Sequence, residues 1–306
     1  MPELEAVGRG AGKAWRAIVK TEEDAMATAL EQIRDQQQTT WDRFSAGWRD
    51  WDDLVLTWLA PVGSALLDSA GLRPTSYVLD VASGTGEPAL TAAARCPRGK
   101  VMMTDLAGKM LRVAEESAAR RGLRNVEARQ CDAGALPFSD GTFDAVTARF
   151  GFMFFPDVPG AARELARVAR PGARVAVSVW GAPQKNPWAT LIMGTIAKHV
   201  ELPTPPPDAP GLFRCAAAGY MAGVLREAGL RDVTETEVSA PLRFDDPAQY
   251  FKFMNEVAAP VVAGMAKADE ATRAKIRDVV LGLVTERAPS GEVRLDATAL
   301  VVTGEK

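Results

Sequence analysis

Apolar residues follow two alternating patterns through the middle of the chain. Short, nearly continuous apolar runs are typical of strands buried on both faces of a sheet, and apolar positions three or four residues apart are typical of helices. The runs predict strands at residues 77–81, 100–104, 125–130, 143–148 and 173–180. The spaced positions predict helices at residues 88–95, 107–121 and 159–170. Strands that alternate with helices predict an α/β fold with a doubly wound, parallel sheet.

The segment before the first strand predicts helices that cover the sheet. Apolar side chains recur at helical spacing over residues 22–38, and the first twenty residues, which contain three glycines, are expected to pack loosely. Over residues 41–58 large side chains align on one helical face: Trp41, Phe44, Trp48, Trp51, Val55 and Trp58. Packing on the main domain is the commonest fate of such a face. The alternative is that Trp41, Phe44 and Trp48 close over a ligand pocket and bind substrate.

Beyond the fifth strand the pattern adds inserted helices to the sheet. Helices are predicted at residues 188–200 and 216–228, strands at 232–244 and 293–302, and two helices within 247–287. Helices inserted before a last strand favour a lid or a surface for homo-oligomers. The predicted divisions are an N-terminal helical cap (1–75), a core (76–182), an inserted helix and loop (183–211), a continuation of the core (212–245), a helical lid (246–289) and the last core strand (290–306).

The first strand leads into a glycine-rich turn within residues 77–90, which read YVLDVASGTGEPAL. A strand, a glycine turn and a helix together bind nucleotide-like ligands, because glycine lets the backbone approach the ligand and the helix start offers unpaired N–H groups. The spacing departs from the G-x-G-x-x-G of dinucleotide folds, and Glu87 would repel a pyrophosphate. Asp80, inside the strand, favours a cationic ligand instead.

This segment resembles the first motif of the class I S-adenosylmethionine-dependent methyltransferases, which is an acidic residue followed by G-x-G-x-G. Asp80, Gly84 and Gly86 match that motif. Ala82 stands at the position of its first glycine and adds one methyl group to the turn.

Two later segments carry the same resemblance. Residues 105–111 read DLAGKML against the family pattern D-x-S-x-x-M-L, and Asp132 follows the third strand. Over residues 41–180 the chain resembles the ubiquinone and menaquinone C-methyltransferase-like branch, methyltransferase type 11. The resemblance implies a seven-stranded, Rossmann-like sheet of strand order 3-2-1-4-5-7-6. It also implies S-adenosylmethionine as cofactor and S-adenosylhomocysteine as product.

The positions of individual residues then suggest roles. Asp105 would accept hydrogen bonds from the ribose hydroxyls, and Leu106 and Met110 would pack against adenine. Asp132 would bind the adenine amino group, while the backbone N–H of the next residue reaches a ring nitrogen. Arg149 would hold the cofactor carboxylate or a substrate oxyanion, or else pair with a surface acid. The expected cofactor-binding residues are Asp80, Ala82, Ser83, Gly84, Gly86, Asp105, Leu106, Met110, Asp132, Ala133 and Arg149.

Residues 150–155, which read FGFMFF, follow the fourth strand at the edge where a doubly wound sheet presents its active site. Either these side chains join the core, or Phe150, Phe152 and Met153 form an apolar substrate wall. His199, the sole histidine, is the candidate general base because an ordinary histidine titrates near neutrality. Its alternative is a structural or solvated role. We expect methyl transfer to a carbon or oxygen of an aromatic, quinone-like, polyketide or isoprenoid small molecule, in specialised metabolism.

Composition narrows the partners and the location. The net charge of -3 and a sequence pI near 5.5 argue against a nucleic-acid surface. The three cysteines lack C-x-x-C spacing, and no pair of acids has metal-ligand spacing, so neither a disulfide framework nor a metal is expected. No apolar run is long enough to span a membrane and the N-terminus lacks a signal-peptide core, which predicts a cytoplasmic protein.

Two other functions stay open from the sequence. A methyltransferase that acts on protein or RNA would carry a basic patch near the cofactor. A nicotinamide dehydrogenase, or a nucleotide-binding module without catalysis, would bind NADH in place of S-adenosylhomocysteine. The acidic residue Glu87 beside the turn favours S-adenosylhomocysteine.

Overall fold

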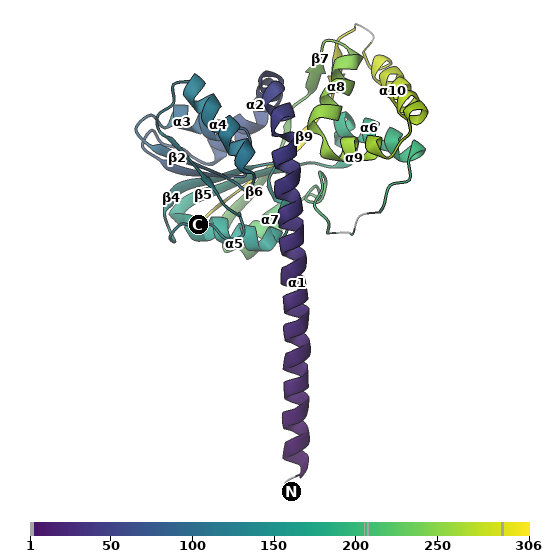
Figure 1. The fold of residues 1–306 in the computed structure, drawn as a ribbon. Coiled ribbons are helices and arrows are strands. Elements are labelled where there is room, and N and C mark those ends of the chain that lie inside the picture. The colour runs from purple at the N-terminus through teal and green to yellow at the C-terminus, as the bar shows by residue number, and fades with distance from the viewer. Residues whose placement is uncertain (1–2, 205, 207, 289–290) are drawn as a thin grey trace.

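A seven-stranded sheet forms the centre of the computed structural model, which describes residues 3–204, 206, 208–288 and 291–306, with side chains from residue 24 onward (Figure 1). The strands are, in spatial order, β3 (Val126–Gln130), β2 (Lys100–Asp105), β1 (Tyr77–Val81), β4 (Phe143–Arg149), β5 (Ala169–Trp180), β9 (Thr298–Glu305) and β6 (Arg231–Ser239). Neighbouring strands from β3 to β5 are parallel, and β9 is antiparallel to β5 and β6. The predicted α/β class and strand order are confirmed.

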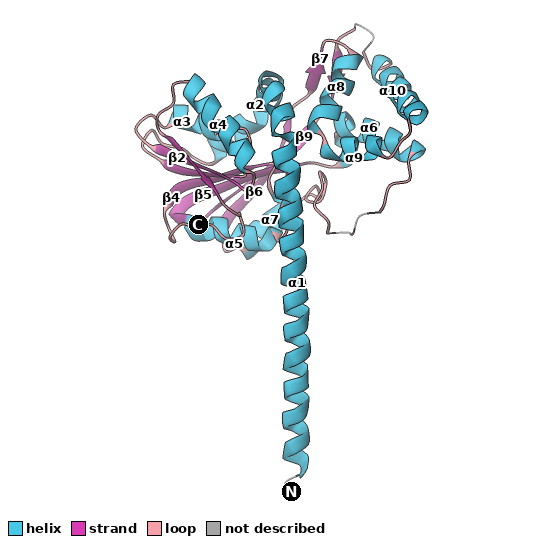
Figure 2. Ribbon diagram, viewed as in Figure 1, coloured by secondary structure: helices cyan, strands magenta, loops and turns pink. Residues whose placement is uncertain are grey.

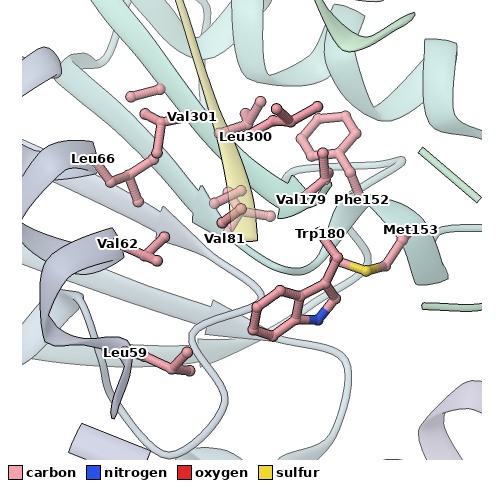
Figure 3. Packing of buried hydrophobic residues seen from close by; sticks show 14 of the residues in the cluster. Leu59, Val62, Leu66, Val81, Phe152, Met153, Val179, Trp180, Leu300 and Val301 are labelled. Atoms are coloured by element: carbon pink, nitrogen blue, oxygen red, sulfur yellow. The ribbon is translucent and has the colours of Figure 1, made fainter. Parts of the chain in front are cut away.

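Helices cover both faces of this sheet. α2 (Asp52–Ser69), α3 (Ala89–Arg95) and α4 (Gly108–Arg120) lie on one face, and α5 (Val158–Val168) and α7 (Tyr220–Glu227) lie on the other (Figure 1). Side chains of α2, among them Val62 and Leu66, join Val81, Val179 and Val301 in one buried cluster (Figure 3). Burial of apolar surface stabilises these layers by roughly 25 cal/mol for each Å² removed from water. Because both faces are covered, the central strands are mostly apolar, with Asp80 of β1 and Thr147 of β4 as buried polar exceptions.

A second lobe beside the sheet consists of helices and a short two-stranded sheet (Figure 2). Its elements are α6 (Pro187–His199), β7 (Leu242–Phe244), α8 (Pro247–Val257), α9 (Ala259–Ala266), α10 (Glu270–Thr285) and β8 (Val293–Leu295). α6 packs against α9 and α10, so the first inserted helix and the predicted lid fold together. Two short 3-10 helices, η1 (Phe152–Phe154) and η2 (Pro183–Lys185), follow β4 and β5. Self-association through the inserted helices stays a prediction.

The strands predicted at residues 232–244 and 293–302 are each divided in two, so the prediction of single strands was wrong there. β6 pairs with β9 as far as Ser239 and Thr298. The Ala240 N–H then donates to the Ala297 carbonyl at 2.9 Å, and the same two chain segments pair again as β7 and β8. The two paired chain segments therefore run together from the main sheet into the second lobe. Apolar side chains are buried in β9, β7 and β8, although β6 has no buried residue, so an apolar run alone does not show where the paired segments change sheet.

The segment of residues 247–287 forms three helices where two are predicted. Ala258 has an extended backbone, with φ −99° and ψ 94°, and it separates α8 from α9. Pro260 follows in the first turn of α9, where its missing N–H costs no helical hydrogen bond. The same proline cannot continue α8, which ends before it.

The two N-terminal helices meet at Trp51, whereas the sequence predicted their boundary between residues 38 and 41. α1 is one continuous helix, Glu3–Asp50, whose first part extends far beyond the sheet (Figure 1). Trp51 leaves helical geometry, with φ −103° and ψ 15°, and the acidic pair Asp52 and Asp53 favours a new helix start there. The aromatic stripe of residues 41–58 is therefore shared between two helices. Within the described residues, no helix combines the length and apolar character needed to cross a membrane.

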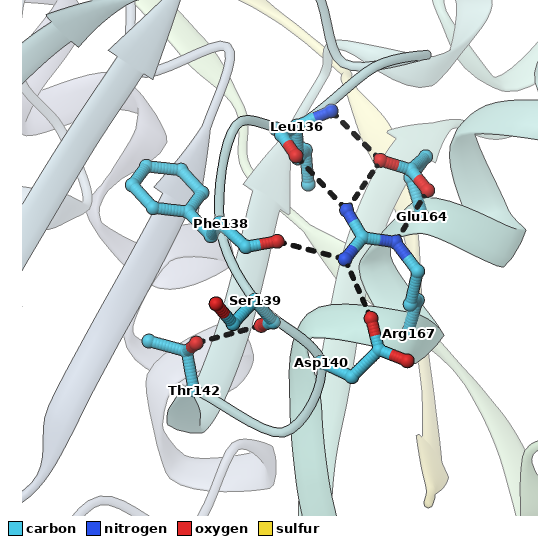
Figure 4. A network of polar contacts seen from close by, with 7 residues as sticks. All are labelled: Leu136, Phe138, Ser139, Asp140, Thr142, Glu164 and Arg167. Atoms are coloured by element: carbon cyan, nitrogen blue, oxygen red, sulfur yellow. Dashed lines mark hydrogen bonds and ion pairs between the residues drawn. The ribbon is translucent and has the colours of Figure 1, made fainter.

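Arg167 of α5 holds the loop that follows β3 (Figure 4). Its guanidinium donates to the carbonyl oxygens of Leu136 at 2.9 Å and Phe138 at 2.7 Å, and to the Asp140 carboxylate at 2.8 Å. Glu164 completes the network by accepting from Arg167 and from the Leu136 N–H at 2.7 Å. The hydrogen bonds from Arg167 lower the pKa of Glu164. This network fixes the loop whose first residues include Asp132.

Candidate functional site

Three carboxylates lie at the carboxyl ends of three adjacent parallel strands. Asp80 is in β1, Asp105 ends β2, and Asp132 follows β3 by two residues. Because β3, β2 and β1 are neighbours and parallel, these ends meet at one edge of the sheet. Asp80, Asp105 and Asp132 therefore lie across this edge in the same order as along the chain.

Asp105 connects the glycine turn to the start of α4. Its Oδ2 accepts a hydrogen bond from the Gly84 N–H at 2.9 Å, and its Oδ1 accepts one from the Ala107 N–H at 2.8 Å. Burial raises the pKa of Asp105 to about 6, and these backbone N–H groups oppose the rise. A carboxylate offers about four acceptor positions. The positions that backbone N–H groups leave open are available for hydroxyl groups of a ligand.

Asp80 is fully buried and only half hydrogen-bonded. Its Oδ1 accepts from the Thr147 hydroxyl at 2.6 Å, whereas Oδ2 has no partner among the described residues. Burial raises the pKa of Asp80 to about 7, against the lowering effects of the Thr147 and Ser83 hydroxyls and of the positive charge of Arg149. A buried, unpaired carboxylate oxygen is costly. Such an atom fits a ligand that brings a cationic N–H donor.

Arg149, the last residue of β4, supplies the positive charge of the site. Its Nη1 lies near Gly63 of α2, 3.9 Å from where a Cβ on that glycine would be. Burial lowers the pKa of Arg149, and the negative charges of Glu87, Asp80 and Asp52 oppose that change. Within the described part of the chain, no hydrogen bond or ion pair occupies its guanidinium. The group can therefore donate hydrogen bonds to a ligand carboxylate.

The turn itself has left-handed backbone at three positions: Ala82 with φ +55°, Gly84 with φ +55° and Gly86 with φ +115°. A side chain at Gly86 would come within 2.8 Å of Leu90 Cδ1, so glycine is required there by space as well as by φ. The Ser83 hydroxyl donates to the Asp80 carbonyl at 2.9 Å and closes the turn.

Ala82 is accommodated because a glycine faces it. A Cβ at Gly151, after β4, would lie 2.8 Å from the Ala82 Cβ and 2.9 Å from Phe155 Cζ. Gly151→Ala is expected to lower the free energy of unfolding by about 1–3 kcal/mol through overpacking. Ala82→Gly in the same background removes the clash with Ala82 but not the one with Phe155, so it should recover part of that loss, as urea unfolding of the four proteins of the cycle would measure.

The control for this cycle is Gly194→Ala in α6, where the added Cβ meets no atom within 4 Å. It should raise stability by about 0.5–1 kcal/mol, as expected for glycine to alanine inside a helix. Strictly additive effects of Gly151→Ala and Ala82→Gly would contradict the proposed contact.

The expected adenine-facing residues lie on the same edge. Leu106 and Met110 flank the start of α4, with Met110 buried and Leu106 half-buried. Asp132 Oδ1 accepts from the Gly134 N–H at 2.8 Å, which orders the loop around the buried Ala133. The structure thus gathers the predicted cofactor residues along one edge, although their contacts with a ligand stay predictions.

The predicted substrate residues divide by exposure. Trp41 packs edge to face on Trp48 at 6.2 Å and on Phe154 at 5.0 Å, and the buried Trp48 Nε1 has no acceptor among the described residues. Phe150, with φ +58°, stacks on Trp180 at 4.1 Å and is half-buried. By contrast, three of the candidates are core side chains: Phe44, Phe152 and Met153.

His199 lies at the C-terminal end of α6, in the second lobe. Its Nδ1 is 2.9 Å from the carbonyl oxygen of Thr195 in the same helix. Because a carbonyl only accepts, Nδ1 carries the hydrogen and Nε2 is left as an acceptor in the neutral ring. Among the described residues, no hydrogen bond joins His199 to the three carboxylates.

Two residues of this edge were not predicted as site residues. Thr147 lies opposite Asp80 in the β1–β4 register and binds its carboxylate. A polar residue within the apolar run at residues 143–148 was the available signal. Trp180 ends β5 at the same edge and stacks with Phe150 and, at 5.4 Å, with Trp58. The sequence carried no signal for that stacking, because it depends on how α2 lies on the sheet.

Comparison with known proteins finds methyltransferases among the proteins similar to this chain. A family model described as a methyltransferase domain matches residues 78–172. Nocamycin O-methyltransferase of Saccharothrix syringae is 34% identical over 203 residues, which cover 63% of this chain and 72% of that protein. Demethylmenaquinone methyltransferase of Thermus thermophilus is 46% identical over 120 residues, 39% of this chain and 54% of that protein.

Two mycobacterial relatives and one solved structure are also similar to this chain. The chain spans 43% and 59% of the length of two mycobacterial relatives, which are 42% and 37% identical to it. The crystal structure of the YcgJ protein from Bacillus subtilis has a TM-score of 0.54 at 20% identity, covers 80% of this chain and 97% of its own, and shows the shared fold. Because the Saccharothrix relative is 34% identical and is aligned over more than two thirds of its length, this chain belongs to the class I S-adenosylmethionine-dependent methyltransferases.

Proposed function

We propose that the protein transfers the methyl group of S-adenosylmethionine to a carbon or oxygen atom of an apolar small molecule of aromatic, quinone-like, polyketide or isoprenoid type. The observation that carries this proposal is the buried carboxyl group of Asp80, whose Oδ2 lacks a partner within the described residues. The cofactor's ammonium group would supply both a positive charge and an N–H donor for that oxygen. The names of two relatives, which specify nocamycin and demethylmenaquinone, support a small-molecule acceptor.

The other residues of the edge fit the remaining parts of the cofactor. Asp105 keeps acceptor positions for the two ribose hydroxyls, and Arg149 has a guanidinium that can hold the amino-acid carboxylate. Leu106 and Met110 provide apolar surface for adenine, and Asp132 an acceptor for its amino group. When bound, S-adenosylmethionine supplies a methyl group made electrophilic by the adjacent positive sulfur.

The contribution of the chain to transfer is then to exclude water and align the acceptor. Trp41, Trp48 and Phe150 are the proposed substrate wall, and Trp48 Nε1, which has no acceptor among the described residues, can donate to an oxygen of the methyl acceptor. Phe44, Phe152 and Met153 would support this wall from the core. Where the nucleophile is a hydroxyl, its proton must leave, and His199 Nε2 is the proposed base.

Calorimetry and isotope labelling test the proposal. S-adenosylhomocysteine is expected to bind with micromolar affinity and NADH not to bind. Incubation with methyl-deuterated cofactor and a small-molecule extract should label an apolar compound, detected by mass spectrometry. Label confined to protein or RNA would instead support a macromolecular methyltransferase. Binding of NADH without S-adenosylhomocysteine would overturn the proposal in favour of a dehydrogenase or nucleotide-binding module.

A further inference from the structure

Helix α4 starts without a capping side chain of its own. Its N-cap residue is Ala107, with φ −91° and ψ 106°, and no side-chain hydrogen bond is made there. The first N–H groups of a helix have no partner inside the helix, and serine, threonine, aspartate or asparagine at the N-cap normally accepts from one of them. The serine that the family pattern has at this position is the residue this chain lacks.

The missing acceptor comes from α1. The Lys109 backbone N–H donates to Asp42 Oδ1 at 2.8 Å, across 67 residues of chain. Lys109 is the second residue of α4, the position that an N-cap side chain commonly binds. A carboxylate at a helix N-terminus also interacts favourably with the helix dipole. Asp42 therefore replaces the local cap with one from another helix.

The segment that leads into α4 is held at both ends. Asp105 Oδ1 accepts from the Ala107 N–H, and its Oδ2 accepts from Gly84 in the glycine turn. Asp42 holds the other end through Lys109. Leu106 lies within this segment, so its place in the proposed adenosine site depends on both carboxylates.

The same part of α1 is fixed to the second lobe. A Cβ at Gly47 would lie 2.3 Å from the Glu256 carbonyl oxygen of α8, which shows how closely the two helices approach. Trp51, directly after α1, donates from Nε1 to Glu256 Oε2 at 2.7 Å. Residues 41–51 thus contact α4 on the sheet side and α8 on the lobe side.

We propose that Asp42 is a positioning residue for cofactor binding, which couples the docking of residues 41–51 between the two lobes to the shape of the adenosine-binding segment. The inference rests on the proposed function. According to this inference, the hydrogen bond from Lys109 to Asp42 of α1 increases the affinity for the cofactor. Conversely, bound cofactor would hold α1 in place by the same free energy, because such coupling is reciprocal.

The test measures S-adenosylhomocysteine binding by calorimetry. Asp42→Ala is expected to raise the dissociation constant about fivefold to tenfold, in line with the usual loss on removing a cap. Asp42→Asn keeps an acceptor oxygen and should stay near wild type. Adding Ala107→Ser to Asp42→Ala restores a local cap and should recover most of the affinity. Asp35→Ala, an exposed acid on the same helix, is the matched control and should change nothing.

Hydrogen exchange separates capping from coupling. In the wild type, S-adenosylhomocysteine should slow amide exchange both in residues 41–51 and at the start of α4. In Asp42→Ala with Ala107→Ser it should slow exchange in α4 alone. No recovery of affinity by Ala107→Ser, or equal affinity in Asp42→Ala and the wild type, would overturn the role of Asp42. Failure of the wild type itself to bind would overturn the proposed function instead.

Discussion

Asp80→Asn is expected to weaken S-adenosylhomocysteine binding by about 100-fold. Truncating one partner of a buried, hydrogen-bonded charge pair typically costs 2–5 kcal/mol, and about 2.7 kcal/mol corresponds to 100-fold. Asparagine retains an oxygen that can accept from Thr147, so the fold should survive. Its amide nitrogen would replace Oδ2, which has no partner among the described residues, and would face the ammonium group of the ligand without charge. Calorimetry on both proteins at pH 7.5 measures the loss.

The affinity of the wild type should depend on pH with a defined sign. The pKa of Asp80 is raised to about 7 and that of Asp105 to about 6, so both carboxyl groups are partly protonated in mildly acidic solution. If the ligand requires ionised Asp80, protonation of Asp80 alone should weaken binding roughly eightfold between pH 7.5 and pH 6. Asp80→Asn should leave a weaker dependence, centred near the pKa of Asp105. A wild-type affinity that is flat over this range would contradict the assigned ionic contact.

The ligand-free protein should show the opposite trend in stability. The folded-state pKa of Asp80 lies above its unfolded value near 3.8, so its stabilising contribution is present below pH 4 and lost as pH rises through about 7. Asp80→Asn should therefore be more stable than the wild type at pH 8, and this advantage should shrink toward pH 4. Thermal unfolding at both pH values measures it. Lower stability of the variant at pH 8 would mean that the Asp80 charge is satisfied inside the protein.

Asp105→Ala is the second change with a large expected effect, and it should weaken S-adenosylhomocysteine binding about 100-fold or more. Two backbone N–H groups, of Gly84 and Ala107, lose their acceptor at the same time as the ribose hydroxyls do. Asp105→Asn should weaken binding nearly as much, because the amide nitrogen of asparagine would face one of those N–H donors. This distinguishes Asp105 from Asp42, where asparagine is expected to be tolerated.

The control for Asp105→Asn is Asp278→Asn, which makes the same change in net charge at an exposed position of α10. It should leave the dissociation constant of S-adenosylhomocysteine unchanged. Affinity within twofold of the wild type in Asp105→Asn would show that Asp105 supports neither the turn nor the ligand.

The sequence alone predicted the sheet and the order of its acids. Asp80, Asp105 and Asp132 each follow or end a recognisable strand, and in a parallel sheet the carboxyl ends of neighbouring strands meet at one edge. The strand order therefore determines where these acids lie. The apolar runs predict the strands, and the family resemblance implies their order. The same reasoning explains why the helices that alternate with these strands were predicted within one or two residues at most ends.

The tertiary structure alone decided the contacts between distant segments. The Asp42 hydrogen bond to Lys109, the space for Ala82 opposite Gly151 and the stacking of Phe150 on Trp180 each join residues from separate elements. The passage of the β6–β9 ribbon into β7–β8 is of the same kind. Periodicity along a chain reports which side of a helix or strand is buried, but not which neighbour buries it. That choice depends on the packing of whole elements, so only the folded chain reveals how α1 completes the start of α4.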